Sequence, residues 1–233
     1  MSILSLPPVN TAGDKRVWQD VNGGSALVIA EASQQAPGLT VVIADSAKTA
    51  AELESELRFF LGEGAAVLHF PDWETLPYDI FSPHQDIVSE RLRTLSRLPQ
   101  TRTGVVIVPV GTLMHRLPPT EFVNQRAFDY RRGDKLNLDT LRTQLESAGY
   151  RCVDTVAEHG EYAVRGALID IFPMGATLPF RIDLFDDEIE TLRTFDPDTQ
   201  RTLEQTDHIH LLPAREVPLD KPAIRRFQDN WLS

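Results

Sequence analysis

GLTVVIAD (residues 38–45), AAVLHF (residues 65–70) and GVVIVPV (residues 104–110) are the three stretches that decide the fold of the first half of the chain. They are rich in Val and Ile, and apolar and polar residues do not alternate in them. Strands that are buried on both faces of a parallel sheet have this composition, whereas a strand with one wet face alternates. The three stretches therefore predict a parallel sheet.

Helical patterns lie between these strands. In the stretch at residues 45–62, Ser46 is placed to cap a helix that Gly62 ends, and a second helix is predicted at residues 86–99. The expected buried stripes are Leu53, Leu57 and Phe60 in the first helix, and Val88, Leu92, Leu95 and Leu98 in the second. Strands that alternate with helices indicate a doubly wound α/β layer structure.

The pattern changes after about residue 126. One short helix is predicted at residues 137–150, with Leu141, Leu145 and Ala148 on its buried side. Turn signals then recur at Gly160, at residues 173–175, at Asp186 and Asp187, and at residues 196–200, which predicts a meander of about five antiparallel strands. The chain thus divides into an α/β domain (residues 1–126), a small α+β insert (residues 127–213) and a helical restart (residues 214–233).

The restart carries an apolar stripe of Ile224, Phe227 and Trp231 near the end of the sequence. Such a stripe normally packs against another element. We expect the chain to be a piece of a longer protein whose further part covers this face.

The stretch FRIDLFDDEIE (residues 180–190) is predicted to be a strand that runs into a turn. Side chains alternate between the two faces of a strand, so three apolar residues share one face, namely Phe180, Ile182 and Leu184. Arg181, Asp183 and Phe185 must share the other. A phenylalanine on a wet face beside an arginine is either an accident of surface composition or a contact point for another molecule.

Composition limits the classes of protein to consider. The 233 residues are 42% apolar and 24% charged, which is typical of a globular domain with a real core. Neither a run of eighteen apolar residues nor a secretory signal is evident, so we expect a cytoplasmic protein. A single cysteine, Cys152, excludes an intrachain disulfide and is expected to be a small buried residue. The net charge of −11 disfavours binding to nucleic acid by this chain alone.

The stretch VNGGSALVIAEA (residues 21–32) occupies the place of a phosphate loop, with Gly23, Gly24 and Ser25 forming a tight turn into a helix. A working loop also needs a Lys that reaches the β- and γ-phosphates, and this Lys is absent. We interpret the stretch as a degenerate, non-functional loop. Nor does a convincing acidic strand end follow it to hold magnesium.

Other candidate groups have simpler explanations. The acidic residues of 183–190 lack the spacing of a calcium loop and fit a solvated hairpin turn. His208 and His210 share a strand face as metal ligands sometimes do, but a third ligand is not evident at a recognisable spacing. The sequence thus specifies neither an active site nor a metal site, and the fragment is predicted to be non-catalytic and to use no cofactor.

Four long motifs, at residues 70–98, 104–119, 141–175 and 178–202, closely resemble the amino-terminal region of the bacterial transcription-repair coupling factor family. That region is in turn similar to the excision-repair protein UvrB. The resemblance implies a helicase-like (RecA-type) α/β domain 1A at residues 1–126, an inserted domain 2 at residues 127–213 and the start of domain 1B at residues 214–233.

The resemblance also implies a function. In this family the insert docks onto the repair ATPase UvrA, and the implied contact residues are Arg165, Arg181 and Phe185. RNA polymerase and double-stranded DNA bind other domains of the full-length family, whose motor uses ATP and Mg. The hairpin with which UvrB grips damaged DNA has no counterpart here, because only HQDIV (residues 84–88) stands in its place.

Alternatives remain open at this point. Phe185 can pack under a neighbouring loop, with both arginines paired to Asp183 and Asp187 at the surface, and Gly166 can carry a bulge that turns Arg165 to the other face. For the whole chain, the competing function is a nucleotide-dependent, helicase-like ATPase half-domain. A reader of DNA damage is disfavoured by the net charge and the missing hairpin.

Overall fold

The computed structural model describes residues 13, 15, 17, 24–76, 79–219 and 221–231. They form two compact units. The first comprises the described residues of Met1–Asp72 together with Arg97–Arg116, and the second comprises those of Trp73–Ser96 together with Leu117–Ser233. None of the helices in the described part is long and apolar enough to cross a membrane.

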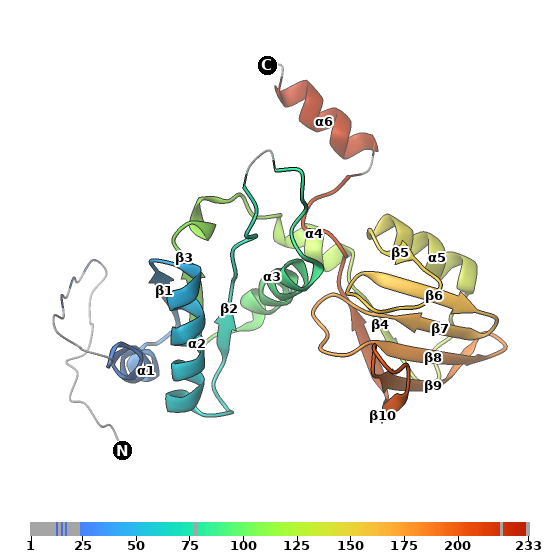
Figure 1. The fold of residues 1–233 in the computed structure, drawn as a ribbon, viewed down its shortest axis with the longest axis horizontal. Coiled ribbons are helices and arrows are strands. Elements are labelled where there is room, and N and C mark those ends of the chain that lie inside the picture. The colour runs from blue at the N-terminus through green and yellow to red at the C-terminus, as the bar shows by residue number, and fades with distance from the viewer. Residues whose placement is uncertain are drawn as a thin grey trace. The chain divides into compact units, whose positions relative to one another are not determined.

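The first unit contains a parallel sheet with the strand order β1, β3, β2, and two helices pack on one of its faces (Figure 1). The register pairs both Val41 and Leu68 with Val106 of the central strand. In chain order the elements are α1 (Ser25–Gln35), β1 (Leu39–Ala44), α2 (Ala47–Leu61), β2 (Val67–His69), η1 (Leu98–Gln100), β3 (Gly104–Pro109) and η2 (Thr112–Met114). The predicted parallel sheet is confirmed, whereas the finer RecA-type arrangement stays a prediction.

Helix α2 follows the sequence pattern closely at its ends. The Ser46 hydroxyl accepts a hydrogen bond from the Thr49 amide at 3.1 Å, and Gly62 ends the helix with φ at 73°. Leu57 is fully buried, but Phe60 is exposed, so the predicted stripe is wrong at that residue. Leu61, four residues after Leu57, packs against the core instead.

The second unit is built on a six-stranded sheet with the strand order β10, β9, β8, β7, β6, β5. Its strands are β5 (Arg151–Cys152), β6 (Glu161–Arg165), β7 (Leu168–Ile171), β8 (Phe180–Phe185), β9 (Glu188–Phe195) and β10 (Thr202–Thr206). The five strands from β6 to β10 form the predicted antiparallel meander. Strand β5 joins its edge in parallel, and Cys152 on it is exposed, so the prediction of a buried cysteine is wrong.

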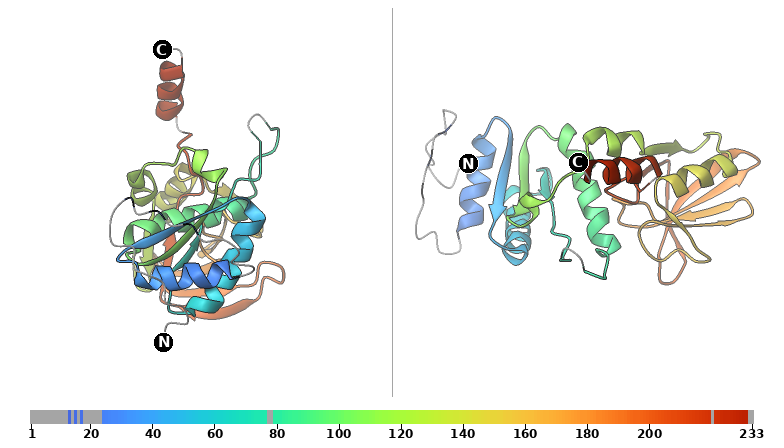
Figure 2. Two further views of the ribbon diagram at one scale, coloured as in Figure 1. Left: turned by 90° about the vertical axis from the view of Figure 1, so that its left-hand side faces the viewer. Right: turned by 90° about the horizontal axis from the view of Figure 1, so that it is seen from above.

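Helix α5 (Leu138–Ser147) covers one face of this sheet, and Figure 2 shows it lying along the strands. The Asn137 side chain accepts a hydrogen bond from the Thr140 amide and so caps the helix start. Leu141 and Leu145 are buried in one core with the inward residues of the sheet, among them Ile169. The helix and its buried side agree with the sequence prediction.

Two further strands and two helices belong to the second unit. Strands β4 (Phe128–Arg131) and β11 (His208–Leu211) pair as a separate antiparallel ribbon, which the sequence pattern did not reveal. Helix α4 (Thr120–Gln125) precedes β4, and helix α6 (Lys221–Trp231) follows the last strand. The apolar stripe of α6 is exposed at Ile224, Phe227 and Trp231.

Helix α3 (Gln85–Arg97), apart from its last residue, belongs to the second unit. Leu92 is buried in the same core as helix α5, and the Ser89 hydroxyl accepts a hydrogen bond from the Gly175 amide at 2.8 Å. Arg91 is fully buried and donates to both carboxylate oxygens of Glu216, at 2.5 and 3.0 Å. The two hydrogen-bonded partners, Gly175 and Glu216, lie 86 and 125 positions later in the chain, so these contacts hold the helix to distant parts of the sequence.

The compact units are therefore divided differently from the domains at residues 1–126, 127–213 and 214–233 that the sequence predicts. Residues 73–96 pack with the second unit because Arg91 and Leu92 find their buried partners there. Periodicity showed a helix with an apolar side, and it could not show which core that side joins.

Candidate functional site

The two faces of the six-stranded sheet have different environments. Phe180, Ile182 and Leu184 of β8 point into the core shared with α5, as the alternation predicts. Phe185 lies at the end of the strand, opposite Glu188 across a two-residue turn, and is 69% exposed. The turn begins with Asp186 at φ 56°, a left-handed conformation that aspartate tolerates well. An aromatic ring is thus held in solvent at the tip of a regular hairpin.

Arg165 lies on the same face of the sheet as Phe185. It ends β6 and pairs with Leu168 across the turn, and Leu168 in turn pairs with Asp183 of β8. Gly166 adopts φ 64° as part of this turn. The bulge considered at Gly166 is absent from the β6–β7 pairing that the structure describes, so the alternation assigns Arg165 its face without ambiguity.

Asp170 is the centre of the charged network on this face. It is completely buried in the middle of β7, where its Oδ1 accepts from Arg181 Nε at 2.7 Å and its Oδ2 from Arg181 Nη2 at 2.9 Å. Oδ2 also accepts from Nη2 of Arg165. One carboxylate therefore serves two guanidinium groups, one from each neighbouring strand.

Arg181 is held on several sides. Besides its bidentate pair with Asp170, its Nη1 donates to the Gln200 carbonyl at 3.3 Å, and its guanidinium lies 4.7 Å from the centre of the Phe195 ring. The hydrogen bond to Asp170 raises the pKa of Arg181 above its ordinary value, against the opposing effect of burial. Only 15% of its side chain is exposed, compared with 48% for Arg165.

The surface carboxylates considered as partners for these arginines are used elsewhere. Asp183 accepts from the Thr191 hydroxyl at 2.7 Å and pairs with Arg193. Asp187 pairs with Lys135 at 3.2 Å. Of the hairpin carboxylates, Asp183 is therefore an ion-paired strand residue and not simply a solvated turn residue. Both arginines instead hydrogen-bond to Asp170 on the strand between them, and not to Asp183 and Asp187 as in the alternative considered from the sequence.

Together these residues form a surface with two kinds of member, which we call the docking face: Arg165, Asp170, Arg181 and Phe185. Phe185 and Arg165 are exposed enough for a partner to contact them. They lie on β8 and β6, and the usual strand spacing places these two strands about 10 Å apart, on either side of β7. Arg181 and Asp170 lie deeper and are ion-paired with each other. Aromatic rings and arginines are the side chains most often found as anchors of protein interfaces.

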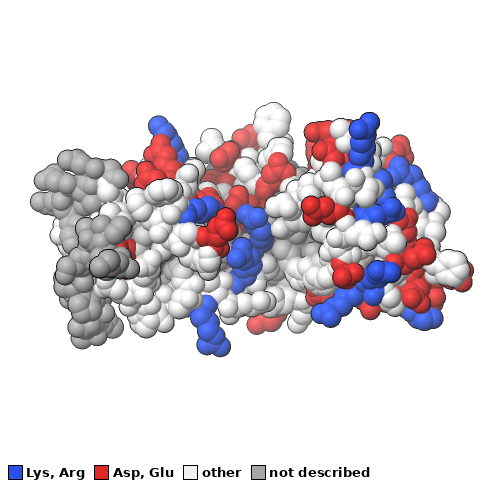
Figure 3. All heavy atoms as spheres, turned by 90° about the horizontal axis from the view of Figure 1, so that it is seen from below, with Lys and Arg blue, Asp and Glu red and all other residues white. Residues whose placement is uncertain are grey.

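Charges of both signs lie on one face of the second unit. In the view of Figure 3, basic and acidic side chains alternate over this unit, and neither sign forms a continuous patch on that face. A nucleic-acid surface characteristically has a continuous basic stripe, since it must neutralise many phosphates. Mixed charges fit a protein partner better.

The degenerate phosphate loop lies in the first unit. Gly23 is outside the described residues, Gly24 precedes helix α1, and Ser25 is its first residue. Ligands of parallel α/β sheets bind at the carboxyl ends of the strands. At that end Asp72 accepts a hydrogen bond from the Thr112 hydroxyl at 3.1 Å, so this carboxylate is engaged with the neighbouring strand's connection.

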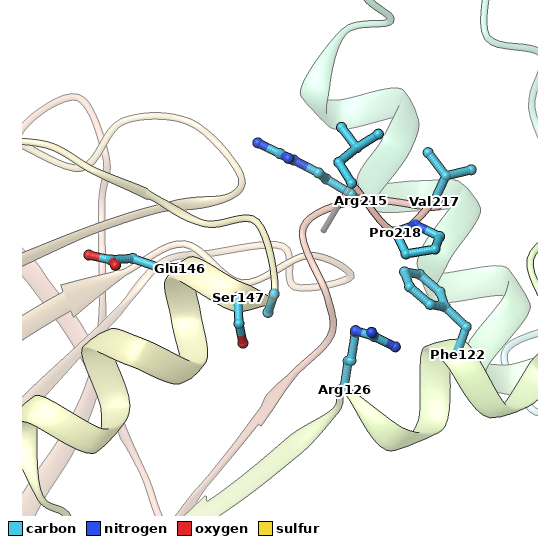
Figure 4. Close-up of a pocket in the computed structure, with 9 residues that line it drawn as sticks. Phe122, Arg126, Glu146, Ser147, Arg215, Val217 and Pro218 are labelled. Atoms are coloured by element: carbon cyan, nitrogen blue, oxygen red, sulfur yellow. The ribbon is translucent and has the colours of Figure 1, made fainter. Parts of the chain in front are cut away.

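One small cavity of about 150 Å³ lies between α4, the end of α5 and residues 215–219 (Figure 4). Arg126 lies with its guanidinium carbon 4.5 Å from the centre of the Phe122 ring. Glu146 and Arg215 direct their charged ends away from that ring. The lining thus brings no acid, base and nucleophile together, which distinguishes it from a catalytic pocket.

His208 and His210 both contact Oδ1 of Asp129, at 2.8 and 2.9 Å. Burial alone would raise the pKa of Asp129, but the two histidine contacts outweigh it and hold the pKa below its ordinary value. The sequence had revealed neither Asp129 as their partner nor the β4–β11 pairing that brings it there. These polar side chains are satisfied by one another on an exposed ribbon.

Sequence reasoning missed Asp170, the most buried member of the docking face. The visible sign is a single aspartate between Ile169 and Ile171 in an otherwise apolar strand. A buried carboxylate must be paired, so arginines on both neighbouring strands were its natural partners. Strand pairing was needed to recognise them.

Comparison with known proteins identifies the class of the second unit. Residues 128–217 match the family model of the UvrB interaction domain. This segment begins at β4 and contains the whole six-stranded sheet, including all four residues of the docking face.

Whole sequences give the more particular relationship. The chain is 52% identical over 221 residues to the transcription-repair-coupling factor of Escherichia coli, which covers 94% of this chain and 19% of that protein. Identity to the Haemophilus influenzae transcription-repair-coupling factor is 50% over 206 residues, covering 88% and 18%. The corresponding factor of Myxococcus xanthus is 35% identical over 217 residues, covering 89% and 18%. These matches confirm the resemblance to transcription-repair coupling factors, and the chain spans about a fifth of the length of these relatives.

Proposed function

We propose that this chain is a recruitment module of a transcription-repair coupling factor, and that it binds the repair ATPase UvrA through the docking face. Arg165, Arg181 and Phe185 are the members through which the face recognises UvrA: Arg165 and Phe185 by direct contact, and Arg181, whose side chain is only 15% exposed, through the ion pair that it forms with Asp170 beneath them. By bringing UvrA to a stalled transcription complex, the module couples transcription to excision repair. RNA polymerase and double-stranded DNA are bound by other parts of the longer protein.

The observation that supports this proposal most strongly is the exposure of Phe185. The ring is exposed to solvent at the tip of the β8–β9 hairpin, on the same face as the arginine network, inside the segment that matches the UvrB interaction domain. A large apolar group costs free energy when it is left in water, and burying a ring on association recovers part of it. Phe185 is therefore the side chain expected to anchor the partner.

The module itself is proposed to be non-catalytic and to work without a cofactor. The turn at Gly24 and Ser25 is followed by neither lysine nor arginine within helix α1, so phosphates would lack the charge that a working loop supplies. ATP and Mg belong to the motor part of the longer protein. DNA binding by this chain is expected to be weak.

Binding isotherms with purified UvrA test the proposal. We expect the wild-type chain to bind, and Phe185→Ala to weaken binding by about 2 kcal/mol, or roughly thirtyfold, as for a central anchor. Leu203→Ala is the matched control, because Leu203 is an exposed apolar residue on β10 of the same sheet. Equal affinities for the wild type and Phe185→Ala would remove this residue from the interface.

A nucleotide titration separates the proposal from the competing function. A helicase-like ATPase half-domain should bind ATP with micromolar affinity in calorimetry. The recruitment module should give no heat of binding over the same range.

A further inference from the structure

Asp170 has the strongest constraint of any residue on the docking face. It is fully buried, and its two oxygens accept three hydrogen bonds from two arginines. A buried carboxylate without donors is strongly unfavourable, so its charge is retained only because both arginines satisfy it. The carboxylate and the arginines therefore fix one another's positions.

The two arginines are not held equally. Arg181 grips Asp170 with two parallel hydrogen bonds, packs on Phe195 and contacts the Gln200 carbonyl. Arg165 reaches Asp170 with one nitrogen, Nη2, while about half of its side chain is in solvent. Arg181 thus acts as a brace, by which we mean that its two hydrogen bonds fix the position of the Asp170 carboxylate. The carboxylate in turn holds Arg165, whose side chain is half exposed to solvent.

A flexible arginine on a surface loses rotamer freedom when a partner immobilises it. An arginine already tethered to a fixed carboxylate has lost much of that freedom before the partner arrives. Preorganisation of this kind strengthens binding although the tethering residue makes no contact with the partner.

We propose that Asp170, braced by Arg181, is a positioning residue that preorganises Arg165 for the partner of the docking face. This inference rests on the proposed function, because it concerns the affinity for UvrA. Asp170 itself is buried beneath the surface and touches no partner.

Double-mutant cycles with the whole chain test this role. We expect Asp170→Asn to weaken UvrA binding about tenfold, and to keep that effect when Phe185 is replaced by Ala. In an Arg165→Ala chain, however, Asp170→Asn should change binding less than about twofold, since the side chain to be positioned is gone. Equal effects in the two backgrounds would indicate a general structural role and overturn the proposal.

Asp183→Asn is the matched control. It breaks a different arginine–carboxylate pair on the same face, between Asp183 and Arg193, and should change binding by less than about threefold. A tenfold loss in this control would mean that any broken pair on this face weakens binding, which also contradicts the specific role of Asp170.

Thermal melts of each variant precede the isotherms. If Asp170→Asn does not fold, Arg181→Lys takes its place, because lysine keeps the charge but cannot form the two parallel hydrogen bonds. We then expect a loss of about threefold that disappears in the Arg165→Ala chain, and unchanged affinity would overturn the proposal. A wild-type chain that fails to bind UvrA overturns the proposed function and this inference together, whereas a wild type that binds as tightly as Asp170→Asn overturns the inference alone.

Discussion

Two arginine–carboxylate centres of the second unit differ in how completely they are closed. In the first, Arg91 is fully buried and donates to both oxygens of Glu216, which also accepts from the Trp73 indole at 3.0 Å. In the second, Asp170 is equally buried, but Arg165 remains half in solvent. Both charged side chains of the first centre are thus buried, whereas at the second centre about half of the Arg165 side chain is exposed to solvent.

This difference separates a structural ion pair from one that can serve a partner. The guanidinium of Arg91 lies 4.7 Å from the Trp73 ring centre, and its pair joins α3 to the segment after β11. Such a pair costs desolvation free energy, and its hydrogen bonds fix how α3 lies against this segment. At the second centre, the buried carboxylate fixes the geometry while the exposed arginine stays available. Five substitutions sharpen this contrast, and the four experiments that compare them run from the largest expected effect on stability to the smallest.

Glu216→Gln should have the largest effect. It removes the negative charge that the buried Arg91 grips with two hydrogen bonds, which is expected to lower the free energy of unfolding by about 3–5 kcal/mol. Denaturant titration of the whole chain measures this loss. Asp187→Asn, which breaks an exposed pair with Lys135, is the control and should change stability by less than about 1 kcal/mol. Equal losses of unfolding free energy in the two variants would show that the buried pair of Arg91 and Glu216 contributes no more to stability than an exposed pair.

Arg181→Ala should cost less, about 2–3 kcal/mol, because Asp170 keeps Arg165 as a partner. Arg165→Ala should cost about 1 kcal/mol or less, since its guanidinium is half exposed and Arg181 still satisfies the carboxylate. The same denaturant titration compares the two. If Arg165→Ala is the more destabilising change, the division into a brace and an exposed arginine is wrong.

Glu161→Gln tests a carboxylate that is held mostly by backbone donors. Burial would raise the pKa of Glu161, but hydrogen bonds from the Ala157 and Glu158 amides and from Arg151 outweigh it and lower the pKa. A lowered pKa stabilises the fold above the ordinary glutamate pKa of about 4.3, and this contribution is lost as the pH falls through the folded-state value.

At pH 7 we therefore expect Glu161→Gln to be about 1–3 kcal/mol less stable than the wild type. The difference should shrink as the pH is lowered below about 4.3. Unfolding measured from pH 7 to pH 3 provides the check. A difference that stays constant with pH would mean that the charge of Glu161 is not what the amides stabilise.

Phe185→Ala should have the smallest effect on stability, within about 0.5 kcal/mol, since the ring is exposed. A buried phenylalanine would cost roughly 3–5 kcal/mol instead. Thermal melts distinguish these outcomes. A large fall in the melting temperature would show that Phe185 is a core residue and not, like Arg165, a side chain exposed to a partner.

Much of this architecture could be predicted from the sequence because it depends on local periodicity. Apolar runs without alternation identified the parallel strands, and the 3.6-residue pattern of Leu141, Leu145 and Ala148 identified α5. Strict alternation in residues 180–185 placed Phe185 outside and Ile182 inside. Each of these features depends on residues that lie only a few positions apart, so the local sequence is enough to predict it.

The partners of charged residues were decided only by the tertiary structure. Arg91 lies outside the predicted apolar stripe of its helix but is fully buried on Glu216, 125 residues away, and α3 consequently belongs to the second unit. Asp170 receives Arg165 and Arg181 because strand register brings three strands together. Ion pairing depends on distances in space that a periodic pattern does not contain, so the sequence determined the local pattern of each helix and strand, and the fold determined which charged residues are paired and buried.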